Sequence, residues 1–401
     1  MELFKNTNFD FLGRKWPFII ASLVLLAAGI GSLVLQGGPR QGIDFRGGVL
    51  MYVRFAEQPP ADRIRSALAA EIPGEIVVQD IAGAPEVIVT TELQDERSLD
   101  DARRTIVSTL AATFDPQPGK LDFNNSGQGA LADRLRDPLL RAGVALSEQE
   151  LQSLVGRMLN YRDTPPRSGL IRSFDELRTV EGVTPQVVEV MNAELYPAPF
   201  AIRNVEMVGP KIGAELRMQA ILATLYALGG MLVYIAFRFE WVYGVAAVVA
   251  VFHDTLITIG LFSLFDREIS LTVVAALLTL VGYSMNDTIV IFDRIRENLK
   301  LRRREAYPSI VNASINQTLS RTVMTSGLTF LSVLALFLFG GPVLNNFAFA
   351  LVVGILVGTY SSVFIASPIL VFWYNLQESR KAAASVAAPT LARKGNPKAV
   401  R

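Results

Sequence analysis

Apolar residues gather along the chain in long blocks that are separated by polar stretches. Each block comes close to the ~20 predominantly apolar residues that a helix needs to cross a bilayer. The blocks cover residues 17–36, 217–238, 241–264, 269–292, 319–340 and 346–373. This pattern predicts a polytopic α-helical membrane protein with six transmembrane helices, five of them grouped in a bundle over 217–374.

The first block has the positive start of a secretory signal peptide, because Lys5, Arg14 and Lys15 precede it. Its apolar stretch is longer than a typical signal core, and it ends in Gln-Gly-Gly-Pro-Arg without an Ala-x-Ala cleavage site. We therefore expect residues 1–37 to form a cytoplasmic N-terminus and a retained first transmembrane helix.

Basic residues set the expected orientation, because cytoplasmic loops carry an excess of Lys and Arg. The loop 293–318 and the tail 375–401 are rich in both, whereas the connections after the third and fifth blocks hold only Arg267 and no base, respectively. Both termini are therefore expected in the cytoplasm, with 38–216 on the outer side. The basic tail is expected to be disordered.

The segment between the first two blocks alternates strand and helix patterns. The expected strands are 43–55, 75–80, 86–91 and about 200–208, and the expected helices begin at 61 and cover about 95–113. This β-α-β-β-α-β order predicts a ferredoxin-like α+β domain built from 38–114 and 200–216.

Residues 115–199 interrupt that domain with helical patterns at about 129–142, 147–161, 173–178 and 184–194. The last two patterns, with a turn around Gly182, resemble a helix-hairpin-helix element, and more closely the helical domain of type II secretion pseudopilin-like proteins. One interpretation is a docking module for phosphate or a peptide. The other is a decorative helical insertion. Acidic residues balance the arginine of the element, so phosphate binding has little support.

Composition excludes several classes of function. The chain has no cysteine, a single histidine and a formal net charge of +1, so a disulfide framework, a multi-histidine metal site and nucleic-acid binding are not expected. It also lacks a phosphate-binding loop and a nucleophile–base arrangement. We expect neither enzymatic activity nor a cofactor.

Asp287 lies inside the apolar block 269–292. A carboxylate at that depth costs roughly 2.5–3.5 kcal/mol on insertion scales, so it is either paired or titrates with an ion gradient. Arg321 lies just inside the next block, near the same boundary, and we expect it to pair with Asp287. Two alternatives stay open: a permanent ion pair that staples the helices, and an Arg321 that reaches the headgroups.

Other polar residues accompany Asp287. Ser284 and Tyr283 lie three and four residues before it, on the same helical face, and Asn286 is adjacent. The third block holds His253 and Asp254 near its middle. Together these groups form a candidate proton relay, although a lone histidine is commonly a satisfied core residue.

The sixth block carries small residues at every fourth position. These are Ala350, Gly354, Gly358, Ser362 and Ala366. Such a stripe predicts close helix packing. It would also allow this helix to slide against its neighbours.

Four ordered motifs carry a family resemblance. They are GIDFRGG at 42–48, which includes Asp44, Arg46, Gly47 and Gly48, then VGPKIG at 208–213, GYSMNDTIVIFDRIREN at 282–298 and SRTVMTS at 320–326. Together they resemble the SecF family, the smaller of the paired SecD and SecF subunits of the bacterial Sec translocase, within the resistance-nodulation-division superfamily. The insertion 115–199 departs from the family pattern.

The resemblance implies a bacterial inner-membrane protein with SecD as its obligate half-partner, alongside the SecYEG channel and YajC. It implies that the proton motive force promotes late-stage export of unfolded preproteins, with the proton as the coupling ion. It also places Asp287 and Arg321 on the proton path. Two other functions stay open, namely half of a proton-coupled small-molecule exporter and a non-transporting scaffold of the translocon.

Overall fold

The computed structural model describes residues 7–387 apart from residue 73 and the short stretches 82–83, 93–97 and 115–116. The chain divides into two compact units. The membrane unit comprises residues 1–41 and 219–401, and the sheet unit comprises residues 42–218. Each unit is described separately.

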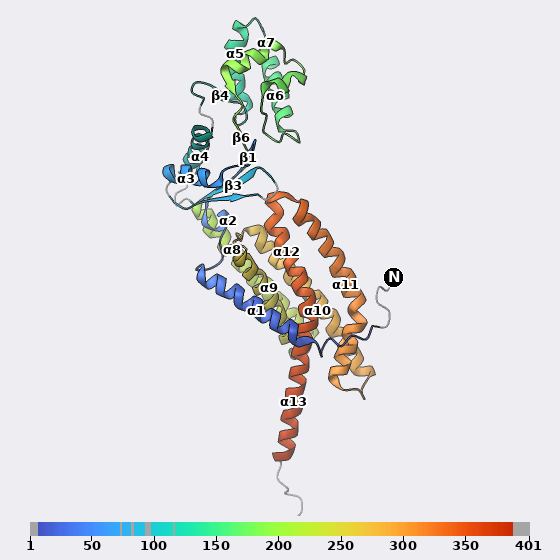
Figure 1. Ribbon diagram of the computed structural model, residues 1–401. Helices are drawn as coiled ribbons and strands as arrows, with labels where there is room; N and C mark the ends of the chain where they lie inside the picture. The colour runs from blue at the N-terminus through green and yellow to red at the C-terminus, as the bar shows by residue number, and fades with distance from the viewer. Residues whose placement is uncertain (1–6, 73, 82–83, 93–97, 115–116, 388–401) are drawn as a thin grey trace, which may run out of the picture. The chain divides into compact units, whose positions relative to one another are not determined.

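Six helices of the described chain are long and apolar enough to cross a membrane, which confirms the prediction from the blocks. They are α1 (Lys15–Leu35), α8 (Pro210–Arg238), α9 (Trp241–Leu264), α10 (Leu271–Leu301), α11 (Tyr307–Phe339), and α12 (Gly341–Ser361) with its continuation. That continuation is a π-helical turn η2 (Ser362–Ala366) followed by α13 (Ser367–Ala387), and α13 is the red helix labelled in Figure 1.

The C-terminal tail, residues 375–401, was expected to be disordered, and its first part is helical instead. Residues 375–387 belong to α13, because the alanine-rich stretch after Lys381 favours helix. Residues 388–401 lie outside the described residues.

Helix packing in the membrane unit relies on small residues at crossing points. The α1 and α9 helices meet at Gly29 and Gly260, where a Cβ added to Gly29 would lie 2.7 Å from the Cα of Gly260. The α12 helix packs against both α10 and α11. Close backbone approach of this kind is what drives helix association in lipid, where the hydrophobic effect between helices is absent.

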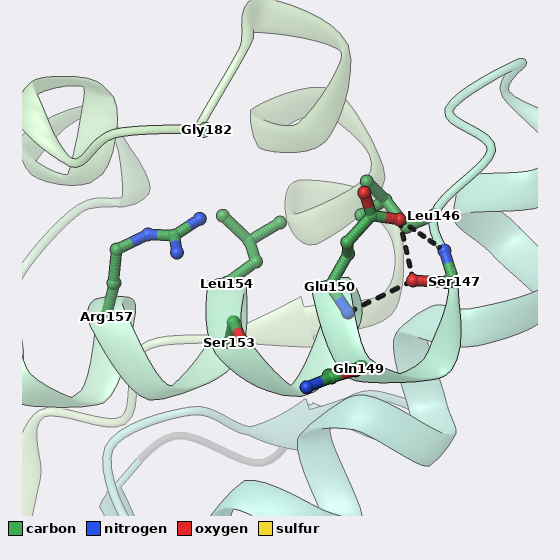
Figure 2. Close-up of a pocket in the computed structure, with 8 residues that line it drawn as sticks. All are labelled: Leu146, Ser147, Gln149, Glu150, Ser153, Leu154, Arg157 and Gly182. Atoms are coloured by element: carbon green, nitrogen blue, oxygen red, sulfur yellow. Dashed lines mark hydrogen bonds between the residues drawn. The ribbon is translucent and has the colours of Figure 1, made fainter.

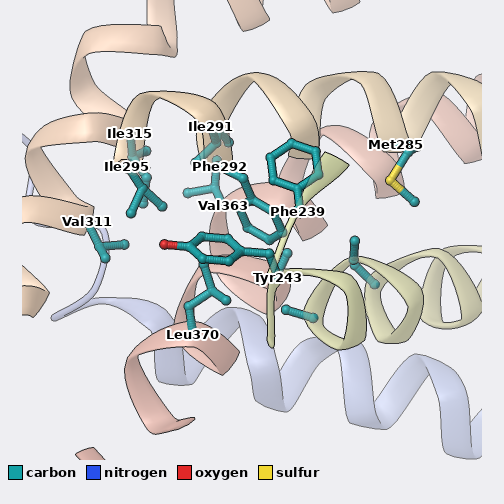
Figure 3. Packing of buried hydrophobic residues seen from close by; sticks show 14 of the residues in the cluster. Phe239, Tyr243, Met285, Ile291, Phe292, Ile295, Val311, Ile315, Val363 and Leu370 are labelled. Carbon is teal, nitrogen blue, oxygen red and sulfur yellow. The ribbon is translucent and has the colours of Figure 1, made fainter. Parts of the chain in front are cut away.

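A hydrophobic cluster fills the end of the membrane unit near the α10–α11 connection. Figure 3 shows Tyr243 and Phe239 surrounded by aliphatic side chains of α10, α11 and α13. The rings of Tyr243 and Phe292 meet edge to face with centroids 5.3 Å apart. This cluster fixes the ends of α9, α10 and α11 against one another.

The segment before α1 is tied to α11 by two asparagines one turn apart. The backbone N–H of Phe9 donates to Oδ1 of Asn316 at 2.9 Å, and the side-chain amides of Asn312 and Asn316 both donate to the carbonyl of Phe9 at 2.9 Å. The N–H of Phe11 donates to Oδ1 of Asn312, also at 2.9 Å. These bonds satisfy backbone groups that lie outside any helix or sheet.

The sheet unit has the expected ferredoxin-like order. Its elements are β1 (Gly48–Phe55), α3 (Ala61–Glu71), β2 (Ile76–Asp80), β3 (Glu86–Thr91), α4 (Ser98–Phe114) and β6 (Phe200–Val208). The strands pair antiparallel in the order β2-β3-β1-β6. Alternate residues of β1, namely Val49, Met51 and Val53, are fully buried in the core between the sheet and its helices, together with Ile64 and Leu68 of α3.

The first expected strand begins too early. Residues 43–46 form a single helical turn, α2 (Ile43–Arg46), which ends at Gly47 with φ +82°. A chain reversal at a positive φ interrupts the strand pattern, and glycine is the residue that accepts it.

The insertion contains α5 (Gln128–Arg141), α6 (Glu148–Asp163), the 3₁₀ helix η1 (Phe174–Thr179) and α7 (Pro185–Glu194) around its own core. These elements lie within a few residues of the expected ones, and Gly182 turns the chain with φ +88°. A two-stranded parallel ladder, β4 (Leu121–Asp122) with β5 (Leu195–Tyr196), was not predicted. Two-residue strands are too short to show periodicity.

Asp122 connects the start of the insertion to its end through hydrogen bonds. Its Oδ1 accepts the backbone N–H groups of Asn124 at 2.8 Å and Ala198 at 3.4 Å, and its Oδ2 accepts the side chain of Asn125 at 2.5 Å. Burial raises the pKa of Asp122 above its ordinary value of 3.8, because these hydrogen bonds only partly offset the desolvation of the charge.

This shift predicts a pH-dependent junction. The carboxyl of Asp122 binds a proton more tightly in the folded protein than in the unfolded chain. The free energy needed to open the junction is therefore highest below the unfolded pKa of 3.8. It falls as the pH rises through the higher folded pKa, and it is constant at pH values above that. Hydrogen exchange at the amides of Asn124 and Ala198, corrected for intrinsic rates, measures this free energy between about pH 4 and pH 7. Asp122→Asn should flatten the profile. A profile that keeps its slope in this variant contradicts the assignment.

Candidate functional site

Polar side chains are buried where α9, α10, α11 and α12 pack together. Those that are less than a tenth exposed include His253, Asp254, Ser284, Asp287, Thr288, Ser326, Ser361 and Ser362. Inside a bilayer a polar group without a partner costs several kcal/mol, so each of these should have one. The hydrogen bonds of the two carboxylates define the site.

Asp254 is only 1% exposed and receives three donors. Its Oδ1 lies 2.8 Å from Nδ1 of His253, and its Oδ2 accepts the hydroxyls of Ser284 at 2.5 Å and Ser361 at 2.8 Å. The three donors come from α9, α10 and α12. These hydrogen bonds link three helices at one level.

Asp287 is 3% exposed, and its Oδ2 accepts the hydroxyl of Ser326 on α11 at 2.7 Å. The expected ion pair with Arg321 is not formed in the described part of the chain. At about 100° per residue, Arg321 leaves α11 roughly 140° away from Ser326, so the two side chains point to different sides of the helix. The guanidinium is exposed, and its positive charge acts on Asp287 through space.

The other candidates on α10 separate into different environments. Ser284, expected beside Asp287, donates to Asp254. Asn286 is exposed on the surface of the helix. Thr288 shares a 2.9 Å hydrogen bond with Ser362 of the π-helical turn. The residues around Asp287 therefore tie α10 to α9 and to η2, and they do not surround one carboxylate.

Two glycines bring α12 against this part of α10. A Cβ added to Gly354 would lie 2.5 Å from Cδ1 of Leu280, and one added to Gly358 would lie 3.0 Å from Cβ of Ser284. The π-helical turn follows directly, and Ser362 within it donates to the carbonyl of Gly358 at 3.0 Å. Turns of this kind occur frequently at functional sites.

Sequence reasoning missed Ser326 and Ser361, the direct partners of the two carboxylates. A signal for Ser326 was present, because Thr322 and Ser326 recur at a spacing of four within the motif 320–326 and both are buried. Ser361 carried no such signal, since it adjoins the small-residue stripe without belonging to it.

The motif at 42–48 has a structural role in the sheet unit. A Cβ on Gly48, whose φ is +140°, would lie 2.0 Å from the carbonyl oxygen of Thr91, and one on Gly47 would lie 2.8 Å from the Cα of Pro210. Arg46 approaches Glu92 at 3.5 Å, and Asp44 lies in the first turn of α2. The glycines allow close backbone packing between this motif and the one at 208–213.

A pocket of about 600 Å³ lies on the insertion, along α6 and beside the Gly182 turn (Figure 2). Glu150 and Arg157 line it, and Glu150 is engaged in a capping box with Ser147. The two opposite charges favour no single class of charged ligand. The described residues hold no cluster of three or more potential metal ligands of the His, Cys, Asp and Glu types.

Known proteins resemble this chain along nearly its whole length. It is 49% identical over 396 residues to the protein translocase subunit SecF of Koribacter versatilis, covering 96% of both chains. The corresponding subunit of Calditerrivibrio nitroreducens is 35% identical over 95% of this chain and 98% of its own. The chain belongs to the SecF family of protein translocase subunits.

Further comparisons agree with this assignment. The family profile described as "Protein export membrane protein SecD/SecF, C-terminal" matches residues 187–376 of this SecF-family chain. The crystal structure of SecDF, a translocon-associated membrane protein from Thermus thermophilus, superimposes with a TM-score of 0.62 at 33% identity. That match covers 92% of this chain and 39% of the SecDF chain. The chain is thus a multi-pass membrane subunit of protein translocation.

Gly358→Ala should disturb the site through packing. The new methyl group would lie 3.0 Å from Cβ of Ser284 and force α12 away from α10, at a cost of about 1–3 kcal/mol. The matched control is Gly282→Ala on α10, where an added Cβ meets nothing within 4 Å. Thermal denaturation of the purified chain in detergent should show a lower midpoint for Gly358→Ala alone. Equal midpoints for the two variants would refute the packing argument.

Proposed function

We propose that this chain is the SecF half of a device that uses the proton motive force to promote late-stage export of preproteins. The observation that carries the proposal is the state of Asp287. Its carboxylate is buried in a membrane helix, its hydrogen-bond partner is the neutral hydroxyl of Ser326, and it contacts no counter-charge among the residues that the structure describes. A permanent ion-pair staple would need Arg321 in contact, so the geometry favours a carboxylate that binds and releases a proton.

Protonation would act on the packing of α10 and α11. The ionised carboxylate accepts the Ser326 hydroxyl and benefits from the charge of Arg321, whereas a neutral carboxylic acid loses most of that attraction. A proton that crosses 100 mV supplies about 2.3 kcal/mol. That is sufficient to shift a two-state equilibrium about fiftyfold, although not to unfold a domain.

The positive-inside rule supports an arrangement with both termini in the cytoplasm and the sheet unit in the periplasm. Membership of the SecF family supports pairing with SecD, since a relative in Thermus thermophilus named protein translocase subunit SecDF matches 44% of this chain at 55% identity. We extend the proposal to the SecYEG channel and YajC as partners, and to unfolded preproteins as the transported chain. We further propose that this protein is located in the cytoplasmic membrane of a bacterium.

Two other functions predict different behaviour. Half of a small-molecule exporter would use the same carboxylate, but the relatives are translocase subunits. A non-transporting scaffold would tolerate the loss of Asp287. A single substitution at Asp287 therefore distinguishes the scaffold hypothesis from the proton-driven one.

Asp287→Asn should abolish the stimulation of export by a proton gradient, because the amide keeps the shape and the Ser326 contact but cannot titrate. The matched control is Asp293→Asn on the same helix, where the carboxylate is exposed and pairs with Arg238 at 2.9 Å. Export into vesicles that contain the reconstituted translocase, with and without a proton gradient, measures the effect.

Both variants should still co-purify with the SecD half, which separates loss of coupling from loss of assembly. Full gradient-dependent export by the Asp287→Asn variant would refute the proposed function. Loss of export in both variants would point to a general requirement for charge on α10 and would count against it as well.

A further inference from the structure

His253 is a buried imidazole in which one ring nitrogen is hydrogen-bonded and the other has no hydrogen-bond partner among the described residues. It is 7% exposed, and Nδ1 lies 2.8 Å from Oδ1 of Asp254. Its Nε2 is buried and finds no hydrogen-bond partner among the described residues. Because Asp254 accepts at Nδ1, the proton of a neutral imidazole lies on that nitrogen and Nε2 keeps a free lone pair.

The charge balance around Asp254 favours a proton at that lone pair. With a neutral imidazole, the carboxylate is a buried negative charge supported only by hydrogen bonds. With an imidazolium, the same contact becomes an ion pair and the local net charge falls to zero. Burial penalises an uncompensated charge far more than a paired one.

Among the described residues of the neighbouring helices few other groups are ionisable, and one of them is Tyr283 of α10, whose hydroxyl is buried and finds no hydrogen-bond partner there. The α12 helix presents Tyr360, whose ring lies edge-on to the imidazole with centroids 6.0 Å apart and whose hydroxyl is 2.8 Å from that of Ser22. The α1 helix carries no ionisable residue after Lys15. The α10 and α12 helices place the hydroxyls of Ser284 and Ser361 on Asp254, and the nearest further acid on α10 is Asp287.

The two carboxylates lie at successive levels of the bundle. Ser284 marks the level of Asp254 on α10, and Asp287 lies three residues further toward the α10–α11 connection, or ~4.5 Å along the helix axis. Arg321 lies five residues closer to that connection than Ser326, or ~7.5 Å. From one side of the membrane unit to the other, the order is therefore His253 with Asp254, then Asp287, then Arg321.

We propose that His253 is a second proton-binding site, which receives the proton at Nε2 before it reaches Asp287. The step adds one proton to Nε2, breaks no bond, and leaves Nδ1–H on the still ionised Asp254. This inference rests on the proposed function, since only proton movement past Asp287 makes the His253 site a relay. On that orientation the basic α10–α11 loop is cytoplasmic, so a proton entering from the periplasm meets His253 first.

The chain contains a single histidine, so one labelled imidazole can be observed directly. The full chain is prepared with ¹⁵N-histidine, assembled with its SecD half in lipid nanodiscs, and followed by solid-state NMR from about pH 5 to pH 9. We expect the neutral Nδ1–H tautomer at high pH and a two-state conversion to the imidazolium as the pH falls. Asp254→Asn removes the negative partner and should lower the midpoint by at least about one pH unit.

Ser22→Ala is the matched control, because it removes the partner of Tyr360 and leaves the contact between His253 and Asp254 in place. Its midpoint should match that of the unmodified chain. A signal that stays in one protonation state over the whole range, or a neutral Nε2–H tautomer, overturns the proposal. The titration of the unmodified chain decides this even where Asp254→Asn does not fold.

The outcome is separable from that of the proposed function. If Asp287→Asn loses gradient-dependent export while His253 does not titrate, the relay fails and the proposed function stands. If His253 titrates while Asp287→Asn exports normally, the proton at His253 is uncoupled from export, and the relay is overturned together with the proposed function.

Discussion

The membrane unit is organised by the need to hold two carboxylates in a low-dielectric interior. Asp254 meets this need with donors from three helices, among them Ser284 and Ser361. Asp287 meets it with one hydroxyl from α11. Because each donor must reach within hydrogen-bond distance, the helices are held in register at these two levels. Glycines let α12 approach α10 closely beside Ser284, which donates to Asp254.

The two carboxylates differ in how firmly they are held, and this difference assigns them different roles. Three donors, the imidazole of His253 among them, hold Asp254 in place between three helices. One hydroxyl and a more distant positive charge leave Asp287 able to change its bonding when it is protonated. A fixed site next to a responsive one is a physically sensible order for a relay, since uptake at the first need not disturb helix packing while arrival at the second does.

Much of the architecture could be predicted from the sequence because it depends on local periodicity. The six spans and the longer helices of the insertion follow from patterns of apolar residues over ten or more positions, and the ferredoxin-like strand order follows from apolar and β-branched runs of five to nine residues. The elements that escaped prediction are short or depend on distant neighbours. They include the two-residue strands β4 and β5, the helical turn at 43–46 and the π-helical turn after Ser361.

The sequence by itself determined that Asp287, His253 and Asp254 lie in membrane-spanning helices, and therefore that they need partners or protons. The tertiary structure alone decided which partners they have. The rotation of α11 about its axis turns Arg321 away from Asp287 and places Ser326 within hydrogen-bond distance of Asp287. The rotation of α10 places Ser284 within hydrogen-bond distance of Asp254. Spacing along one helix fixes which residues share a face, but the rotation of a neighbouring helix is set by packing over its whole length, which no local pattern encodes.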